Sequence, residues 1–162
     1  MGYQAAVLTI SDKGSVGLRE DTSGPAIIEA LKALDIKVNA ALILPDERSQ
    51  IAKQLKTWAL TERFDLIITT GGTGPAPRDW TPEATRDVLD REMPGLPELL
   101  RSEGAKHTPL AVLSRGTAGL CGACLIINLP GSTRAVREGM ETLTPVLLHA
   151  LQMARGTDTE HS

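Results

Sequence analysis

"FDLIITTGGTGPAPRDWTPEAT", residues 64–85, joins an apolar run to a loop with three glycines and then to a helix start. The apolar run lacks polar alternation, which is typical of a strand buried in the middle of a parallel sheet. Helix signals follow the loop, with Thr81 as the expected cap, Pro82 in the first turn and Glu83 near the start. The stretch therefore predicts a strand–loop–helix unit of an α/β protein.

The rest of the chain alternates between strand-like and helix-like segments. Strands are expected at 5–11, 36–45, 110–114 and 125–131, the last in a central position, with a flexible glycine-rich loop at 115–123. Helices are expected at 23–35, from Asp46 or Ser49 to about residue 62, and at 81–92, 97–106 and 132–154, the last bent or interrupted at Pro145. This order predicts a three-layer α/β sandwich with a mostly parallel sheet flanked by helices on both faces.

Length and composition predict one globular domain. The 162 residues, 41% hydrophobic and 23% charged, are enough to close a single core, expected over residues 1–155 with a flexible C-terminal tail at 156–162. A formal net charge of −3 offers no basic field, so no nucleic-acid partner is expected. No apolar run is long enough to span a bilayer and no basic leader precedes one, so we expect a cytoplasmic protein with no membrane partner.

The two cysteines form "CGAC" at Cys121–Cys124, a spacing found in redox motifs and in half of a zinc site. The chain has no second cysteine pair, and the segment leads into a strand instead of opening a helix as thioredoxin-type motifs do. A buried structural pair is therefore the favoured interpretation. The three histidines are scattered and are expected to lie away from the functional edge of the sheet.

The candidate site follows from the fold. In open parallel sheets, ligands bind beyond the carboxyl ends of the strands. Five segments follow apolar strands in the expected order: Ser11 and Asp12, Pro45 and Asp46, Thr70 to Asp79, Ser114 and Arg115, and Asn128 to Ser132. We therefore expect these five segments to converge on one site.

The glycine loop has two interpretations. Gly71, Gly72 and Gly74 could expose N–H groups that cradle a phosphate, or could simply allow a tight turn. Asp79 beside a phosphate cradle indicates a Mg²⁺ ligand, because a carboxylate otherwise repels the anion; its alternative role is a helix cap. For Asp46, spacing alone favours the cap.

Other polar groups support anion binding. Ser114 with Arg115, and Gly131 with Ser132 at a helix N-terminus, are suitable donors for phosphate oxygens. No nucleophile and base pair is evident, so chemistry without a covalent enzyme intermediate is the simpler hypothesis.

Three blocks of sequence, together with residues 64–85, resemble the molybdopterin adenylyltransferase family, which includes the Mog/MoaB proteins and the G domain of gephyrin. They are "LTISDKGSVGLREDTSGP" at 8–25, "LPDE" at 44–47 and "TPLAVLSRGTAGLCGACLIINLPGS" at 108–132. The resemblance covers nearly the whole chain in order. Trp80 and Thr133 depart from the residues usual in the family, and neither change removes a polar group that the expected chemistry needs.

The resemblance implies a homotrimeric nucleotidyltransferase of molybdenum cofactor biosynthesis. Such an enzyme transfers AMP from ATP to the terminal phosphate of molybdopterin, releases pyrophosphate, uses Mg²⁺, and passes its product to a downstream molybdotransferase. By resemblance, Asp46 and Asp79 are the catalytic and metal-directed residues, which replaces the cap interpretation of Asp46. The substrate-binding positions implied by the resemblance are Ser11, Asp12, Thr70, Gly71, Gly72, Thr73, Gly74, Ser114, Asn128 and Gly131; the residue pattern adds Arg115 and Ser132.

Two other functions stay open. A non-catalytic molybdopterin-binding or carrier protein of the MoaB type would share the binding motifs. Metal insertion into the adenylated pterin is a related activity, but proteins with that activity carry additional domains. The motifs fit a molybdenum pathway and a tungsten pathway equally.

Overall fold

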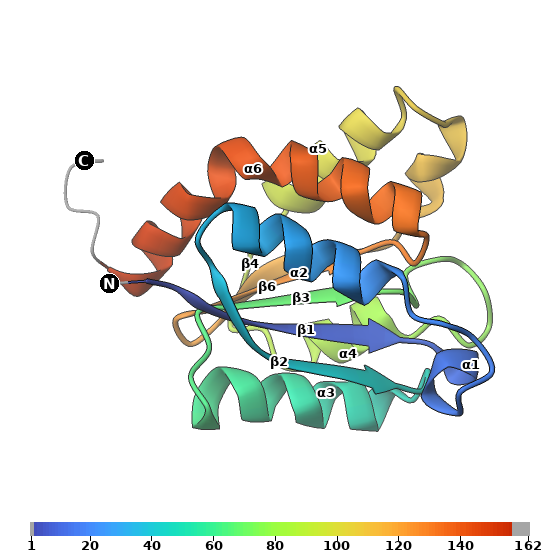
Figure 1. Cartoon of the computed structure of the whole chain (residues 1–162), viewed down its shortest axis with the longest axis horizontal. Helices are drawn as coiled ribbons and strands as arrows, with labels where there is room; N and C mark the ends of the chain where they lie inside the picture. Colours follow the sequence, from blue (N-terminus) through green and yellow to red (C-terminus); the bar gives the residue numbers. More distant parts are fainter. Residues whose placement is uncertain (1, 157–162) are drawn as a thin grey trace.

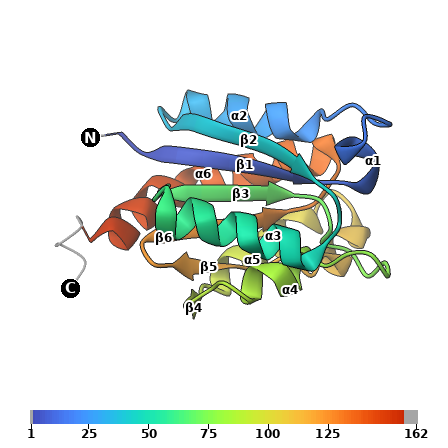
Figure 2. The ribbon, with the colours of Figure 1, turned by 90° about the horizontal axis from the view of Figure 1, so that it is seen from below.

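The computed structural model describes residues 2–156, and six strands in them form one sheet with the order β2-β1-β3-β6-β5-β4. In Figure 1 the strands lie between two layers of helices, and Figure 2 shows the same sheet from below. The strands are β1 (Gln4–Ile10), β2 (Lys37–Leu44), β3 (Leu66–Thr70), β4 (Arg91–Glu92), β5 (Ala118–Cys121) and β6 (Cys124–Leu129).

The four strands β2, β1, β3 and β6 are parallel, whereas β5 and β4 add an antiparallel edge. In register, Thr70 of β3 lies opposite Thr9 of β1 on one side and Leu129 of β6 on the other. The carboxyl ends of β1, β3 and β6 therefore reach the same edge of the sheet. This confirms the predicted three-layer, mostly parallel architecture.

Helices cover both faces of the sheet. The helical segments are α1 (Asp12–Ser15), α2 (Ser23–Ala33), α3 (Arg48–Lys56), α4 (Thr81–Arg86), α5 (Gly95–Gly104) and α6 (Thr133–Arg155), with a π-helical turn η1 (Thr57–Thr61) and a 3-10 turn η2 (Pro109–Leu113). Helices α2, α5 and α6 lie on one face, and α3 and α4 lie on the other (Figure 1). Within residues 2–156, no helix is both long enough and apolar enough to cross a bilayer.

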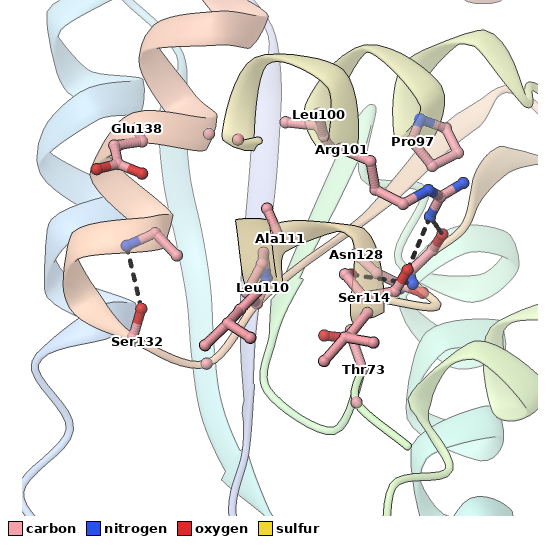
Figure 3. Close-up of a pocket in the computed structure, with 18 of the residues that line it drawn as sticks. Thr73, Pro97, Leu100, Arg101, Leu110, Ala111, Ser114, Asn128, Ser132 and Glu138 are labelled. Atoms are coloured by element: carbon pink, nitrogen blue, oxygen red, sulfur yellow. Dashed lines mark hydrogen bonds between the residues drawn. The ribbon is translucent and has the colours of Figure 1, made fainter. Parts of the chain in front are cut away.

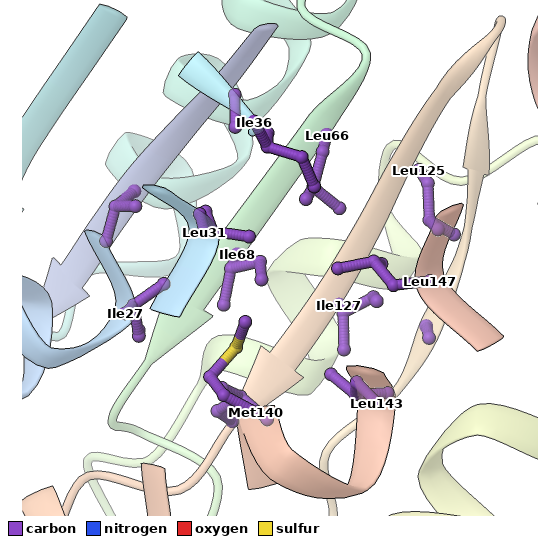
Figure 4. Packing of buried hydrophobic residues seen from close by; sticks show 14 of the residues in the cluster. Ile27, Leu31, Ile36, Leu66, Ile68, Leu125, Ile127, Met140, Leu143 and Leu147 are labelled. Carbon is purple, nitrogen blue, oxygen red and sulfur yellow. The ribbon is translucent and has the colours of Figure 1, made fainter. Parts of the chain in front are cut away.

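The two faces of the sheet carry separate apolar clusters. On one face, Ile68 and Ile127 pack with Leu31 of α2 and with Met140 and Leu143 of α6 (Figure 4). The opposite face packs Ile67 and Ile126 against Ile51, Leu55 and Trp58. Both clusters are built from aliphatic side chains of alternating strand positions, because each parallel strand is buried on both faces.

The segment 110–123 differs from expectation. Residues 110–114 do not form a strand; Pro109 and the side chain of Thr108, which accepts a hydrogen bond from Leu110 N, start the 3-10 turn η2 instead. Ala118–Cys121, expected within a flexible loop, forms strand β5 and pairs with β6 across a tight turn at Gly122, where φ is +59°. A glycine-rich composition masked a strand that is fully buried.

Several helix ends also differ. Neither Asp46 nor Ser49 is the N-cap of α3, because Glu47 occupies that position and makes no side-chain capping bond. Thr81 is the first residue of α4 and not its cap; its hydroxyl donates to Gly71 O. Helix α6 continues through Pro145, so Pro145 does not interrupt the described helix.

The expected tail at 156–162 lies outside the described residues except for Gly156. Gly156 ends α6 in the left-handed region, with φ of +78°.

One glycine in the loop after β3 is fixed by a close backbone approach. Gly71 has a φ of +97°, and a Cβ at this position would lie 2.2 Å from Ile10 O. We expect Gly71→Ala to lower the free energy of unfolding by more than about 2 kcal/mol, because both the dihedral angle and the contact forbid a side chain. Thermal or urea unfolding measures this effect.

Gly95→Ala is the matched control, because a Cβ there meets no atom within 4 Å. Equal stability of Gly71→Ala and Gly95→Ala would contradict the close packing of β1 against the β3 loop.

Candidate functional site

The ends of the neighbouring strands β3 and β6 are tied together by hydrogen bonds at the carboxyl edge. Gly71 N donates to Leu129 O at 3.1 Å, and Thr70 Oγ1 donates to Pro130 O at 2.7 Å. Thr81 Oγ1 donates to Gly71 O at 2.9 Å and is itself fully buried. The glycine loop is therefore held in place by hydrogen bonds and forms the floor of the site. The absence of side chains at its glycines lets the backbone of the loop approach the backbone of the neighbouring segments.

Two cavities open above this floor. One has a volume of about 460 Å³ and the other about 610 Å³. Both are lined by Gly72, Asp79, Gly131 and Ser132. The two cavities therefore meet at the glycine loop and at the N-terminus of α6.

The smaller cavity, called the apolar cavity below, lies between α5, η2 and the start of α6 (Figure 3). Its apolar walls come from Pro97 and Leu100 of α5 and from Leu110, Ala111 and Leu113 of η2. Polar groups stand among them: Arg101, His107, Ser114, Asn128 and Glu138. A concave site with mostly apolar walls and a few polar groups is typical of small-molecule binding.

Asn128 and Ser114 lie on one wall of the apolar cavity (Figure 3). The buried Asn128 amide donates to Thr69 Oγ1 at 2.9 Å and to Thr85 Oγ1 at 3.0 Å, and its oxygen accepts from Thr117 N at 3.1 Å. Asn128 therefore joins β3, β6 and α4. The Ser114 hydroxyl has a weaker partner, Gly116 N at 3.3 Å, and faces the cavity.

The larger cavity, called the acidic cavity below, lies between the β1–α2 loop and the β3 loop. Its wall includes the carboxylates of Asp12, Glu20, Asp21, Asp46 and Asp79. Lys13 and Arg19 are exposed on the same wall, and within residues 2–156 neither forms an ion pair. The site thus combines a carboxylate cluster with two available cations.

Asp12 and Asp46 hold each other by reciprocal backbone bonds. Asp12 N donates to Asp46 Oδ2, and Asp46 N donates to Asp12 Oδ1, both at 3.0 Å. Arg78 donates twice to the Asp12 carboxylate, at 2.7 and 3.0 Å, and once to Glu47. The hydrogen bonds from Arg78 hold the pKa of Asp12 below its ordinary value.

The Asp46 carboxyl behaves in the opposite way. Burial raises its pKa above the ordinary value, the negative charges of Asp12 and Asp79 raise it further, and the hydrogen bond from Asp12 N opposes both effects. The fold therefore holds a carboxylate where its negative charge is unfavourable. A cation at this position would relieve that cost.

Asp79 is placed beside the same glycines. Its Oδ2 accepts from Ala76 N at 3.1 Å, and a Cβ on Gly74 would lie 2.9 Å from that oxygen. A Cβ on Gly72 would lie 3.1 Å from Asp46 Oδ1. Gly72 and Gly74 thus allow both carboxylates to approach the loop.

Most sequence-predicted site residues line one of the two cavities. The acidic cavity takes Ser11, Asp12, Asp46, Thr70 and Gly71; the apolar cavity takes Thr73, Gly74, Ser114 and Asn128; Gly72, Asp79, Gly131 and Ser132 line both. Ser132 is also the N-cap of α6, accepting from Ala135 N at 3.1 Å. Arg115 lines neither cavity, and its guanidinium is hydrogen-bonded to protein acceptors instead.

Sequence reasoning missed several cavity residues. Lys13 and Arg19 could have been found, because they lie in the loop after the first strand, where the site was expected. Arg101 and Glu138 lie on helices far along the chain, where no such expectation existed. The expectation that histidines lie away from the site is wrong for His107, which lines the apolar cavity 3.6 Å from Glu138. Only the folding of α5 against α6 brings this pair together.

The residues present fit a Mg²⁺ ion that is shared with a ligand. Among residues 2–156, no group of three His, Cys, Asp or Glu side chains could hold a metal ion alone. Mg²⁺ is usually held by one or two carboxylates together with substrate phosphates and water. Asp46 and Asp79, with mutually unfavourable charges, match that arrangement.

Comparison with known families gives the decisive match: the family model described as "Probable molybdopterin binding domain" matches residues 6–149. The chain belongs to this family. Its fold is shared with the MoaB molybdopterin biosynthesis enzyme of Thermus thermophilus, with a TM-score of 0.91, 52% identity, and coverage of 95% of this chain and 97% of that chain.

Two relatives with similar sequences differ in how much of their length this chain matches. A molybdopterin adenylyltransferase of Helicobacter pylori is 43% identical over 152 residues, which cover 93% of this chain and 86% of the relative. The molybdenum cofactor synthesis protein cinnamon of Drosophila melanogaster is 43% identical over 148 residues. This chain spans only 25% of the length of cinnamon, and 91% of this chain is matched.

The raised pKa of Asp46 predicts a pH-dependent stability change. The folded protein disfavours the ionised carboxyl, so stability falls as pH rises from the ordinary carboxyl range through the raised pKa. Asp46→Asn, which retains an oxygen acceptor for Asp12 N, should therefore raise the melting temperature at pH 7 in the presence of EDTA. The gain should disappear below about pH 4, where both proteins are neutral at this position.

Differential scanning calorimetry of both proteins across this pH range measures the effect. A lower melting temperature for Asp46→Asn at pH 7 would show that the ionised carboxylate stabilises the fold.

Proposed function

We propose that this protein is a molybdopterin adenylyltransferase of molybdenum cofactor biosynthesis, a nucleotidyltransferase that moves AMP from ATP to the terminal phosphate of molybdopterin. The observation that carries the proposal is the meeting of two unlike cavities at Gly72 and Asp79. A two-substrate transfer needs two binding sites whose reacting ends touch. This geometry supplies them.

The different linings of the two cavities indicate which substrate would bind in each. The apolar walls of Leu100, Leu110 and Ala111 suit the flat pterin ring, with Ser114 as a polar contact. The acidic cavity, with Lys13 and Arg19, suits a triphosphate that binds together with a divalent cation. The terminal phosphate of molybdopterin and the α-phosphate of ATP then meet over the glycine loop.

The reaction needs alignment more than acid–base chemistry. An oxygen of the molybdopterin phosphate forms a bond to the α-phosphorus of ATP, and the bond from that phosphorus to the bridging oxygen of the β-phosphate breaks. Pyrophosphate leaves with the electron pair of that bond. The attacking phosphate is already ionised at neutral pH, so no general base is required.

The protein's contribution is to bring two anions together and to hold them. Gly72 and the N-cap of α6, Ser132, line both cavities, and the N-terminus of a long helix favours negative charge. Asp46 and Asp79 would hold Mg²⁺, which, when bound, neutralises phosphate charge in the transition state. Lys13 and Arg19, which line the acidic cavity, would pair with the departing pyrophosphate.

We also propose that the enzyme works in the cytoplasm, where ATP is available, and that its activated product is consumed by a downstream molybdotransferase. The homotrimer implied by the family resemblance has a candidate surface on the edge strand β2. Leu42 and Ile43 are 44% and 37% exposed there, and an uncovered edge strand with apolar side chains favours contact with another copy.

Asp79→Asn should reduce kcat by about 100-fold or more while molybdopterin affinity stays unchanged, because the carboxylate acts on charge that develops in the transition state. The assay incubates protein, molybdopterin, ATP and Mg²⁺ and identifies adenylylated pterin by mass spectrometry. Equal small losses in affinity and rate would refute the assignment of Asp79. Tight pterin binding by the wild type with no AMP transfer would favour the carrier function instead.

Leu42→Glu should shift the protein to a smaller species in analytical ultracentrifugation, because a charge on the β2 edge disfavours contact between copies. Leu60→Glu is the matched control, since Leu60 is 46% exposed and lies on η1 rather than on the edge strand. An unchanged sedimentation coefficient for Leu42→Glu would place the contact elsewhere.

A further inference from the structure

Arg115 makes an unusual set of contacts for a residue of a candidate anion site. Its Nε donates to Gly74 O at 2.9 Å, and one terminal nitrogen donates to Asp79 O at 2.8 Å. The other terminal nitrogen donates to the Glu83 carboxylate at 2.7 Å. One guanidinium thus binds three acceptors from two parts of the chain.

These contacts span the segment that carries Asp79. Residues 71–80 form the loop between β3 and α4, and Gly74 and Asp79 bound its second half, the segment Gly74–Asp79. Arg115 binds the carbonyl of each of these two residues. The backbone N–H of Arg115 also donates to Thr73 O at 2.7 Å, just before this segment. The residue therefore closes the loop from both ends.

Glu83 fixes the guanidinium in turn. Its Oε2 accepts from Arg115, and its other oxygen, Oε1, is buried without a partner among the described residues. The hydrogen bond from Arg115 holds the pKa of Glu83 below its ordinary value. Because Glu83 lies in the first turn of α4, this pair anchors the loop to the helix that follows it.

Inside the loop, the position of Asp79 depends on short local bonds. Asp79 N donates to Ala76 O at 3.0 Å, and Ala76 N donates to Asp79 Oδ2 at 3.1 Å. A turn of two such bonds is exposed and weak by itself. Holding both ends of the segment would restrict the directions open to the carboxylate.

We propose that Arg115 is a positioning residue that fixes the loop Gly74–Asp79, and with it the carboxylate of Asp79, and that it does not bind substrate phosphate. Each of its three side-chain nitrogens already donates to a protein acceptor, which uses three of the five N–H groups, and it lines neither cavity. The planar fork of a guanidinium suits this task, since the single ammonium group of lysine cannot reach three separated acceptors. The kinetic role of Arg115 rests on the adenylyltransferase function proposed above.

Arg115→Lys and Arg115→Gln separate a positioning role from phosphate binding. A phosphate ligand would be largely preserved by lysine, which keeps the charge. Loop positioning is lost in both variants, so each should lower kcat by about 10- to 100-fold with KM for ATP and for molybdopterin unchanged. Each should also need more Mg²⁺ for half-maximal rate, because the Asp79 ligand is less well placed.

A second measurement does not depend on activity. In hydrogen exchange without ligands, a peptide covering residues 75–80 should exchange faster in both Arg115 variants, while the central strands β3 and β6 keep their protection. Arg86→Gln is the matched control. Arg86 is exposed on α4, the helix that carries Glu83, and it pairs with Glu92 at 3.3 Å, outside both cavities. This control should leave kinetics and exchange unchanged.

The outcomes distinguish this inference from the proposed function. Near wild-type kcat in Arg115→Lys, a raised KM with unchanged kcat in Arg115→Gln, or unchanged exchange at 75–80 would each overturn the positioning role. If wild-type protein forms no adenylylated pterin, the enzyme function fails, and the exchange experiment still tests whether Arg115 holds the loop. If Arg115→Gln does not fold, Arg115→Lys supplies both measurements.

Discussion

The structure depends on the close contact between the ends of β1 and β3. Gly71 lies so near Ile10 O that no side chain could stand between them, and Gly71 N reaches across to Leu129 O. These two contacts bring the ends of β1, β3 and β6 together at the same edge of the sheet. The floor of the two cavities exists because these ends are tied, and so the position of every functional side chain follows from that contact.

The strand order explains why the site forms at this point. After β1 the chain passes through α2 to β2 on one side, and later returns through α3 to β3 on the other side of β1. Helices α2 and α3 therefore cover opposite faces, and the chain diverges between the ends of β1 and β3. Such switch points leave a crevice in doubly wound sheets, and here it holds Ser11, Asp46 and Gly72.

Local sequence signals predicted the fold where one physical effect dominated. Continuous apolar runs identified β1, β3 and β6, because strands buried on both faces need them. The same rule failed at 110–114, where an apolar run with exposed Leu110 and Leu113 lines a cavity as a 3-10 turn. It also failed at 118–121, where glycine content concealed a strand that is stabilised by pairing with β6.

The sequence predicted those residues of the candidate site that lie directly after a strand. Asp46 and Asp79 were singled out from loop positions and family resemblance, and the structure places both on one cavity wall. Their environment was not predictable, since burial of Asp46 and the bonds of Arg78 to Asp12 depend on packing between distant segments. The sequence predicted that Arg115 binds substrate. Its contacts with Gly74, Asp79 and Glu83 also depend on packing between distant segments, so its sequence neighbours do not reveal them.

In the proposed reaction two substrates meet over the glycine loop, one in each cavity. The decisive experiment is a crystal structure with Mn²⁺ and α,β-methylene ATP, an analogue in which the bond to be broken cannot react. We expect anomalous density for Mn²⁺ between Asp46 and Asp79, with the triphosphate in the acidic cavity and the α-phosphorus beside Gly72. A nucleotide bound in the apolar cavity, or a metal held away from these two carboxylates, would contradict this proposal.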